Sequence, residues 1–342
     1  MRAGLVIVAA LLLSMRAGAA TLMQWEPPAD NTFGITAQRL AVVVNDDDPY
    51  SIGASAYYAA KRHVPSRNVI HVHLPLQSDL SAREFETLRT RVIEATPTNV
   101  QAFLLAWVQP YRVDCMSITS AFAFGFDTAY CAKGCVQTKT STYFDSYTRL
   151  PADSLGIFPT MLLAAPDVDE AKSLIDRGIR ADGSHPTGTA YLVSTDDAAR
   201  NVRARYFPAA QAISRGIHSV LTRVGTMRHR NDILAYFVGA RTVDDIATNH
   251  YLPGAVADHL TSTGGDLLHT HQMSSLRWIE AGATGSYGTV VEPCAFTQKF
   301  PDPAVFLKYY LKGETLLEAY WKSVQMPGQG VFIGEPLARP YG

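Results

Sequence analysis

Charged residues and long apolar runs are scarce in this chain of 342 residues, and each scarcity excludes a class of protein. Charged side chains make up 18% of the sequence and the formal net charge is −1, so no basic surface favours nucleic acid or anionic lipid. Apolar residues make up 47%, which excludes a disordered chain. The apolar run 5–13 is far shorter than the about 20 residues that span a bilayer. We expect a globular protein with no nucleic-acid partner and, once mature, no integral membrane segment.

Three common catalytic signatures are also absent. The chain has no Gly-rich phosphate-binding loop, no G-x-S-x-G turn around a serine nucleophile and no H-E-x-x-H zinc motif. Nucleotide binding, the α/β-hydrolase mechanism and the common zinc-protease mechanism therefore lack support. We predict that the protein uses no cofactor and no metal.

The N-terminus has the three parts of an export signal. Arg2 supplies a positive charge, Leu5–Leu13 the apolar region, and Ala17–Ala19 a cleavage site of small residues. We predict that residues 1–19 are removed, which changes the net charge to −3 because they contain Arg2, Arg16 and no acidic residue. The mature protein is expected to be periplasmic or secreted.

Four cysteines remain in the mature chain, and export decides how they are interpreted. An even number of cysteines in an oxidising compartment favours two disulfides. The pairing stays open, because four cysteines allow three connectivities. A CxxxC spacing also resembles half of a zinc site, but no second half with matching spacing occurs. The residues are Cys115, Cys131, Cys135 and Cys294.

Apolar, β-branched runs alternate with amphipathic stretches along the chain. This alternation is typical of a mainly parallel sheet flanked by helices, so we predict an α/β fold. The expected strands are 39–45, 68–74, 100–108, 158–165, 188–194 and 233–238, and the expected helices are 51–62, 81–95, 167–181, 203–224 and 309–324.

The stretch 110–155 lacks this periodicity. It holds three of the four cysteines and many Ser, Thr and Tyr residues, and long irregular segments of this kind are usually functional or covalently stapled. Neither an internal repeat nor a flexible linker interrupts the chain. Residues 20–342 are therefore predicted to form a single domain that carries 110–155 as a cysteine-rich insertion.

Polar residues that can act as catalytic groups gather within residues 249–265. His250 as base, Asp258 as the orienting carboxylate and Ser262 as nucleophile are the residue types of nucleophilic catalysis. His259 is a candidate for ligand binding. If residues 255–260 are helical, the side chains of Asp258 and His259 point about 100° apart and do not share a site easily. Capping of a turn by the hydroxyl side chains is the alternative, purely structural explanation.

A second group of candidates follows a Gly-rich strand near the C-terminus. Cys294 is a catalytic candidate, because a thiolate near a basic residue can act as a nucleophile. A disulfide is the competing role for the same residue. Glu292 and Lys299 are candidate ligand contacts, since a carboxylate at the end of a strand suits the floor of a pocket.

Asp46 and Asp48 follow the first expected strand, at the edge where open α/β sheets bind ligands. Both are therefore candidate ligand contacts. Together with Asp47 they can hold a cation, but adjacent residues of an extended chain point to opposite sides, and one of the three is expected to cap the next helix. His71 and His73 share a face if extended, and ordinary polar partners explain them better than zinc does.

Four segments together resemble a family of exported bacterial proteins without an assigned activity, which is associated with genomes that carry the PEP-CTERM sorting system. The segments are LAVVVNDDDPYSIGASAYYAAKRHVPSRNVI (40–70), LPGAVADHLTSTGG (252–265), GATGSYGTVVEPC (282–294) and GEPLARPYG (334–342). The resemblance extends over nearly the whole mature chain and implies no activity. The sorting tail itself is not found, so the chain is not expected to be a sorted substrate.

The order of elements is also similar to that of gingipain-type cysteine peptidases of the caspase-like fold. The sequence Gly334-Glu335-Pro336 resembles their Gly-Asp-Pro turn, with Glu in place of Asp. The resemblance implies a His after one strand and a nucleophilic Cys after the next. Here these positions fall at 238–240, which has no His, and within 254–262, which has no Cys.

Two functions are compatible with these observations. The first is a catalytically silent, peptidase-like scaffold that binds an envelope or extracellular component. The alternative is an active hydrolase of the cysteine or serine type, which acts on an exported protein or a surface polymer. The missing His–Cys pair favours the first.

Overall fold

A ten-stranded sheet runs through the part of the chain that the structure describes. This computed structural model describes residues 34–132, 135–214, 216–268 and 271–342, so the predicted signal peptide lies outside the described residues. The strand order is β2-β1-β4-β7-β13-β12-β11-β10-β8-β9, and every neighbouring pair is parallel except β12 and β13. Its strands are β1 (Leu40–Asn45), β2 (Val69–Val72), β4 (Ala102–Leu105), β7 (Thr160–Leu162), β8 (Thr189–Ser194), β9 (His218–Arg223), β10 (Ile233–Gly239), β11 (Tyr251–Leu260), β12 (Gly285–Thr289) and β13 (Gly330–Gly334).

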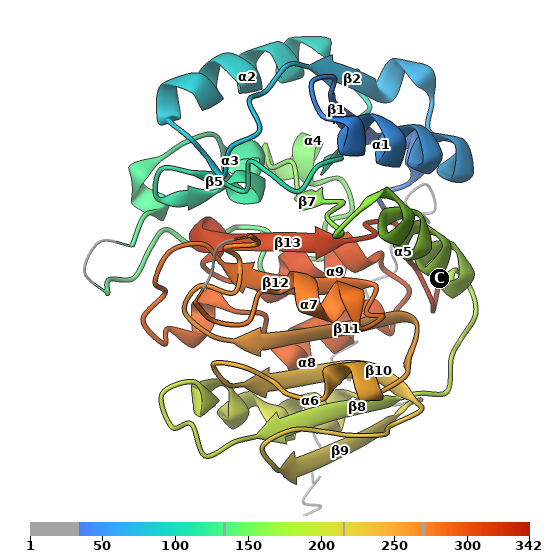
Figure 1. Cartoon of the computed structure of the whole chain (residues 1–342), viewed down its shortest axis with the longest axis vertical. Coiled ribbons are helices and arrows are strands. Elements are labelled where there is room, and N and C mark those ends of the chain that lie inside the picture. The colour runs from blue at the N-terminus through green and yellow to red at the C-terminus, as the bar shows by residue number, and fades with distance from the viewer. Residues whose placement is uncertain (1–33, 133–134, 215, 269–270) are drawn as a thin grey trace, which may run out of the picture. The chain divides into compact units, whose positions relative to one another are not determined.

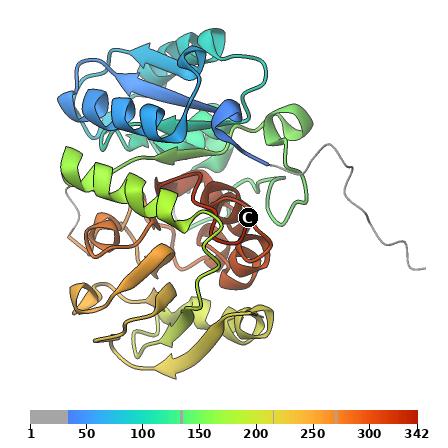
Figure 2. The same ribbon diagram turned by 90° about the vertical axis from the view of Figure 1, so that its right-hand side faces the viewer.

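Helices cover both faces of the sheet (Figures 1 and 2). Adjacent residues of β10 point to the helices on opposite faces of the sheet. Tyr236 packs on Trp278 of α7 (Leu276–Glu280), whereas Phe237 packs on Phe306 of α8 (Pro303–Tyr310). The α-helices are α1 (Pro49–Arg62), α2 (Ala82–Ala95), α3 (Ile118–Phe124), α4 (Pro151–Leu155), α5 (Val168–Ala181), α6 (Phe207–Ile213), α7 (Leu276–Glu280), α8 (Pro303–Tyr310) and α9 (Leu316–Ser323). Among the described residues, no helix has the length and apolarity needed to cross a bilayer.

Strand β13 joins the two halves of the sheet. It pairs in parallel with β7 of the first half and antiparallel with β12 of the second (Figure 1). Gly330 begins the strand, and its carbonyl accepts hydrogen bonds from Ser117 Oγ at 2.6 Å and Thr119 Oγ1 at 2.9 Å. The C-terminal strand is therefore held by the sheet on both sides and by the start of α3.

The predicted α/β fold with a mainly parallel sheet is confirmed, but one helix prediction is wrong, and the conformation of 255–260, which the sequence left open, is now defined. The stretch 203–224 is not one interrupted helix: it holds α6 and the edge strand β9, none of whose residues is buried. The stretch 255–260 is part of β11 and is not helical. The helix pair expected at 309–324 is present, although its first member, α8, begins earlier, at Pro303.

The cysteine-rich insertion is present and is stapled by two disulfides. Cys115 pairs with Cys131, and Cys135 pairs with Cys294. The insertion has little regular structure besides α3, α4 and a small sheet in which β3 (Asp79–Leu80) pairs with β5 (Arg112–Val113) and β5 with β6 (Met116–Ser117). The second disulfide links the insertion to the segment that follows β12.

We predict that Gly330→Ala destabilises the protein. A Cβ at Gly330 would overlap the hydroxyl and ring of Tyr287, both fully buried, so β13 or the aromatic ring has to move. Overpacking of this kind costs about 1–3 kcal/mol, which urea denaturation followed by tryptophan fluorescence measures. Gly225→Ala is the matched control, because a Cβ there meets no atom within 4 Å. Equal stability of the two variants would contradict the assigned packing around β13.

Candidate functional site

A pocket of about 150 Å³ lies at the carboxyl ends of three parallel strands. Its walls are the segments 199–200 after β8, 260–262 at the end of β11, and 292–295 after β12. This is the edge at which open α/β sheets bind ligands. A larger pocket of about 330 Å³ is lined by residues that precede β1, end α1, follow α5 and follow β13.

Arg200 is the cation of the pocket. Its Nη1 contacts Asp197 Oδ2 at 2.9 Å, and its Nε donates to Thr261 Oγ1 at 3.2 Å. A guanidinium has five N–H donors, so these two contacts leave donors for a ligand. Its side chain is 24% exposed, which keeps the group within reach of solvent. The sequence interpretation missed Arg200, although its place shortly after the strand expected at 188–194 was a usable signal.

The loop after β11 is fixed by one side-chain oxygen. Gln272 Oε1 accepts from Thr261 Oγ1 at 2.5 Å, from the Ser262 amide at 2.8 Å and from the Thr263 amide at 3.1 Å. These bonds hold Ser262 at the wall of the pocket. Gln272 was also missed, because nothing in its local sequence marks it.

The structure separates the predicted His250 from the predicted Ser262. His250 immediately precedes β11, where its Nδ1 lies 3.2 Å from the carbonyl oxygen of Asn231, whereas Ser262 follows the other end of the strand. A strand of ten residues is about 30 Å long, so the two side chains do not meet. The predicted set of His250, Asp258 and Ser262 is thus not assembled as a catalytic triad.

Asp258 lies on one face of the sheet, where its side chain is buried and pairs with Arg203. The two side chains are each 1% exposed, and Arg203 Nη1 lies 2.5 Å from Asp258 Oδ1. Arg203 also donates to the carbonyl of Val238 at 2.9 Å and lies 5.4 Å from the ring centre of Phe237. Burial raises the pKa of Asp258 to about 6, against the opposing effect of Arg203. This geometry supports a structural role for Asp258.

His259 points to the opposite face, since neighbouring residues of a strand alternate. Its Nδ1 accepts from Trp278 Nε1 at 2.9 Å, and its Nε2 lies 3.0 Å from the carbonyl oxygen of Met273. An acceptor at Nδ1 and a donor at Nε2 define the neutral tautomer. Burial accordingly lowers the pKa of His259 to about 4. Both ring nitrogens are used inside the protein, so His259 is not placed to bind a ligand.

The segment after β12 contributes Glu292 and Cys294 to the lining of the pocket. Cys294 is bonded to Cys135, and a sulfur in a disulfide has no thiolate that can attack a substrate. Glu292 Oε1 accepts from the Cys294 amide at 2.8 Å. Lys299 is buried behind this wall, where its Nζ donates to the carbonyl of Val136 at 2.9 Å and burial lowers its pKa to about 8. Lys299 is therefore placed to hold the wall.

Asp46 and Asp48 belong to the far half of the sheet and do not join the pocket. Asp48 caps α1 by accepting from the Tyr50 amide at 3.0 Å, which is the capping role expected for one of the three aspartates. Asp46 Oδ1 lies 2.7 Å from His71 Nδ1, and Asp47 Oδ1 lies 3.0 Å from His73 Nδ1. Within the described residues, no group of three His, Cys, Asp or Glu side chains is arranged to hold a metal ion.

Comparison with solved structures places the chain among caspase-like folds. Gingipain R, an Arg-specific cysteine proteinase, superposes with a TM-score of 0.50 at 9% identity, over 89% of this chain and 78% of that chain. A structure described only as a protease gives a TM-score of 0.46 at 8% identity, over 90% of this chain and 79% of that one, which is too low to add weight. No family model and no curated protein matches the sequence.

These findings confirm the predicted caspase/gingipain-like fold and establish nothing about activity. Membership of the PEP-CTERM-associated family stays a prediction. The ends of β10 and β11, where the resemblance implies a His and a Cys, carry Gly239-Ala240 and Thr261-Ser262 in this chain. The pocket at this edge therefore combines a guanidinium, a carboxylate, hydroxyl groups and a disulfide.

We predict that Asp258→Asn destabilises the protein by about 3–5 kcal/mol at pH 7, because it leaves the buried Arg203 charge without its partner. Urea denaturation measures the change. Asp196→Asn is the matched control, since Asp196 is 88% exposed and pairs with Arg223 at the surface, where such a pair contributes at most about 1 kcal/mol. A loss no larger than that of the control would show that Asp258 is not structural.

We also predict an acid-sensitive contribution from His259. The pKa of the His259 ring is about 4 in the folded protein and 6.5 in the unfolded chain. As the pH falls from about 6.5 to about 4, the unfolded chain takes up a proton that the folded protein does not, so stability is lost over this range. The full difference corresponds to about 3 kcal/mol. Urea denaturation of the wild type and His259→Gln across this range should show a weaker pH dependence in the variant. His250→Gln, at an exposed site, should keep the wild-type dependence, and identical curves for all three would refute the assignment.

Proposed function

We propose that the protein is an exported binding protein, built on a caspase-like scaffold, that holds an extracellular or envelope polypeptide without cutting it. The observation that carries this proposal is the content of the pocket: Arg200, Ser262 and Glu292 line it, and the one cysteine among its described lining residues, Cys294, is closed in a disulfide. These groups are suited to recognition. No histidine is among the residues that line the pocket in the described part of the chain, so Ser262 lacks the imidazole base of a Ser–His pair there.

The size of the pocket supports a polymeric ligand. Sites that enclose a small molecule usually have about 300–1,000 Å³, whereas this pocket has about 150 Å³. A cavity of this size admits a single side chain. The remainder of the ligand would then lie along the surface around the pocket.

The charges of the pocket favour a polypeptide over a neutral surface polymer. Arg200 can pair with an acidic side chain, and Glu292, which is exposed, can pair with a basic one. Thr261 and Ser262 add hydroxyl groups at the wall between them. A neutral polysaccharide offers no charged partner for either residue. The predicted export signal places the interaction outside the cytoplasm.

We predict that Arg200→Gln weakens the binding of peptides that carry one acidic residue, and that Glu292→Gln weakens the binding of those that carry one basic residue. Each loss should be about tenfold or more, because a hydrogen bond to a charged group contributes about 1.5–3 kcal/mol. Fluorescence anisotropy with labelled hexapeptides measures both. Arg223→Gln, which removes a guanidinium that is 72% exposed and is not among the residues that line the pocket, is the matched control.

Mass spectrometry of the same peptides after prolonged incubation tests the second half of the proposal. The peptides should remain intact with the oxidised protein. Cleavage that Ser262→Ala abolishes would identify a serine hydrolase and overturn the proposal. If the protein is retained on a neutral envelope polysaccharide and has no affinity for any peptide, the ligand is a surface polymer and the proposed polypeptide ligand is wrong.

A further inference from the structure

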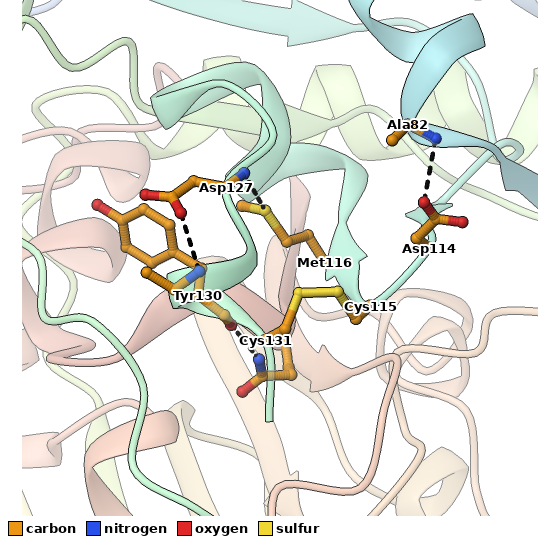
Figure 3. Close-up of a disulfide and its surroundings, with 9 residues drawn as sticks. Ala82, Asp114, Cys115, Met116, Asp127, Tyr130 and Cys131 are labelled. Carbon is orange, nitrogen blue, oxygen red and sulfur yellow. Dashed lines mark hydrogen bonds between the residues drawn. A yellow bond between two sulfur atoms is a disulfide. The ribbon is translucent and has the colours of Figure 1, made fainter. Parts of the chain in front are cut away.

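The two disulfides of this protein lie in different environments. Cys131 is 7% exposed and belongs to the main apolar core, and Cys115 packs against that core beside Met116 (Figure 3). By contrast, Cys135 is exposed and Cys294 is half-buried at the wall of the pocket. The first disulfide thus joins a half-buried cysteine to a buried one, whereas the second joins a half-buried cysteine to an exposed one, so a reductant in solution reaches the second more readily.

The backbone around the second disulfide is also strained. Cys135, Cys294 and Ala295 have φ angles of 61°, 56° and 54°, in the left-handed region that non-glycine residues disfavour. Neither cysteine of the first disulfide has a positive φ, although Asp114, next to Cys115, has one of 45°. Strained residues persist only where the surroundings hold them. Here the restraints are the disulfide, the bond from the Cys294 amide to Glu292, and the bond from Lys299 to the carbonyl of Val136.

We propose that the disulfide between Cys135 and Cys294 is a redox-sensitive switch for the pocket, opened by a dithiol while the disulfide between Cys115 and Cys131 persists. Exposed or strained disulfides are the ones that exchange readily with thiols. The effect on ligand binding rests on the proposed function of the pocket, whereas the order of reduction does not.

The reaction balances with a dithiol as the reductant. One thiolate of the dithiol attacks a sulfur of the protein disulfide, a mixed disulfide forms, and the electron pair of the broken bond goes to the other cysteine, which takes a proton. The second thiolate of the reductant then attacks the mixed disulfide and releases the remaining cysteine as a thiolate, which is protonated by solvent. The dithiol leaves as a disulfide, and the protein holds two thiols.

Reduction would remove the main restraint on one wall of the pocket. Without the bond to Cys135, Cys294 and Ala295 can return to ordinary φ angles, and the carboxylate of Glu292 loses its fixed place beside the Cys294 amide. The oxidised form would thus present Glu292 to a ligand, and the reduced form would not. The switch regulates the same site that binds the polypeptide.

The order of reduction is the first test. The folded protein is equilibrated with mixtures of reduced and oxidised dithiothreitol, the free thiols are alkylated, and peptide mass spectrometry assigns them. Cys135 and Cys294 should be alkylated at a ratio of reduced to oxidised dithiothreitol at least tenfold lower than Cys115 and Cys131. Reduction in the reverse order, or of all four together with global unfolding, would overturn the proposal.

Ala295→Gly tests whether strain contributes to the switch. Glycine tolerates a positive φ, so the oxidised form gains stability and half-reduction should need a ratio about fivefold higher than in the wild type. Gly225→Ala, at a distant open position, should leave the ratio unchanged. If Ala295→Gly is half-reduced at the same ratio of reduced to oxidised dithiothreitol as the wild type, backbone strain does not contribute to the reduction of this disulfide.

The double variant Cys135→Ser/Cys294→Ser tests the effect on the pocket. Hydrogen exchange of residues 292–295 should be faster in this variant than in the oxidised wild type. Binding of the labelled basic hexapeptide should fall several-fold, and reduction of the wild type should have the same effect. Slow exchange of these residues in the variant would overturn the switch. Fast exchange without peptide binding by the oxidised wild type would instead contradict the proposed function and leave the switch intact.

Discussion

Strand β13 is the element on which the rest of the fold depends, because it joins two half-sheets that have no other strand in common. It comes from the end of the described chain and lies between β7 and β12, so the long sheet is complete only when the chain has returned to its centre (Figure 1). Close packing imposes glycine at Gly330, and the hydroxyls of Ser117 and Thr119 hold its carbonyl. The cysteine-rich insertion is therefore anchored to the same strand that unites the sheet.

The sheet also determines which polar groups are available for function. Residues of β11 that point into the two layers are satisfied there, Asp258 by Arg203 and His259 by Trp278 and Met273. The residues that line the pocket lie at or beyond the strand ends, and they come from segments far apart in the sequence. The disulfide between Cys135 and Cys294 fixes the wall after β12, so it shapes the pocket from the side of the insertion.

The sequence was sufficient for the fold class, because buried parallel strands are apolar runs that are easy to recognise between amphipathic helices. It was not sufficient for β9, whose exposed, mixed residues follow directly on a helix and resemble its continuation. The candidate site could not be judged from the sequence, because Tyr251–Leu260 forms one strand and places His250 and Ser262 beyond its opposite ends. The burial of Arg203 and the pairing of the cysteines follow from tertiary contacts that no local pattern encodes.

Hydrogen exchange of the oxidised protein, with and without a saturating hexapeptide selected by anisotropy, tests the central claim most directly. If the carboxyl edge of the second half-sheet binds the ligand, protection should be confined to residues 199–200, 260–262 and 292–295, and the peptide should be recovered intact. Protection around Arg62 and Asp182, in the pocket of about 330 Å³, would contradict the account. Recovery of cleaved peptide would contradict it equally, because the pocket would then be an active site.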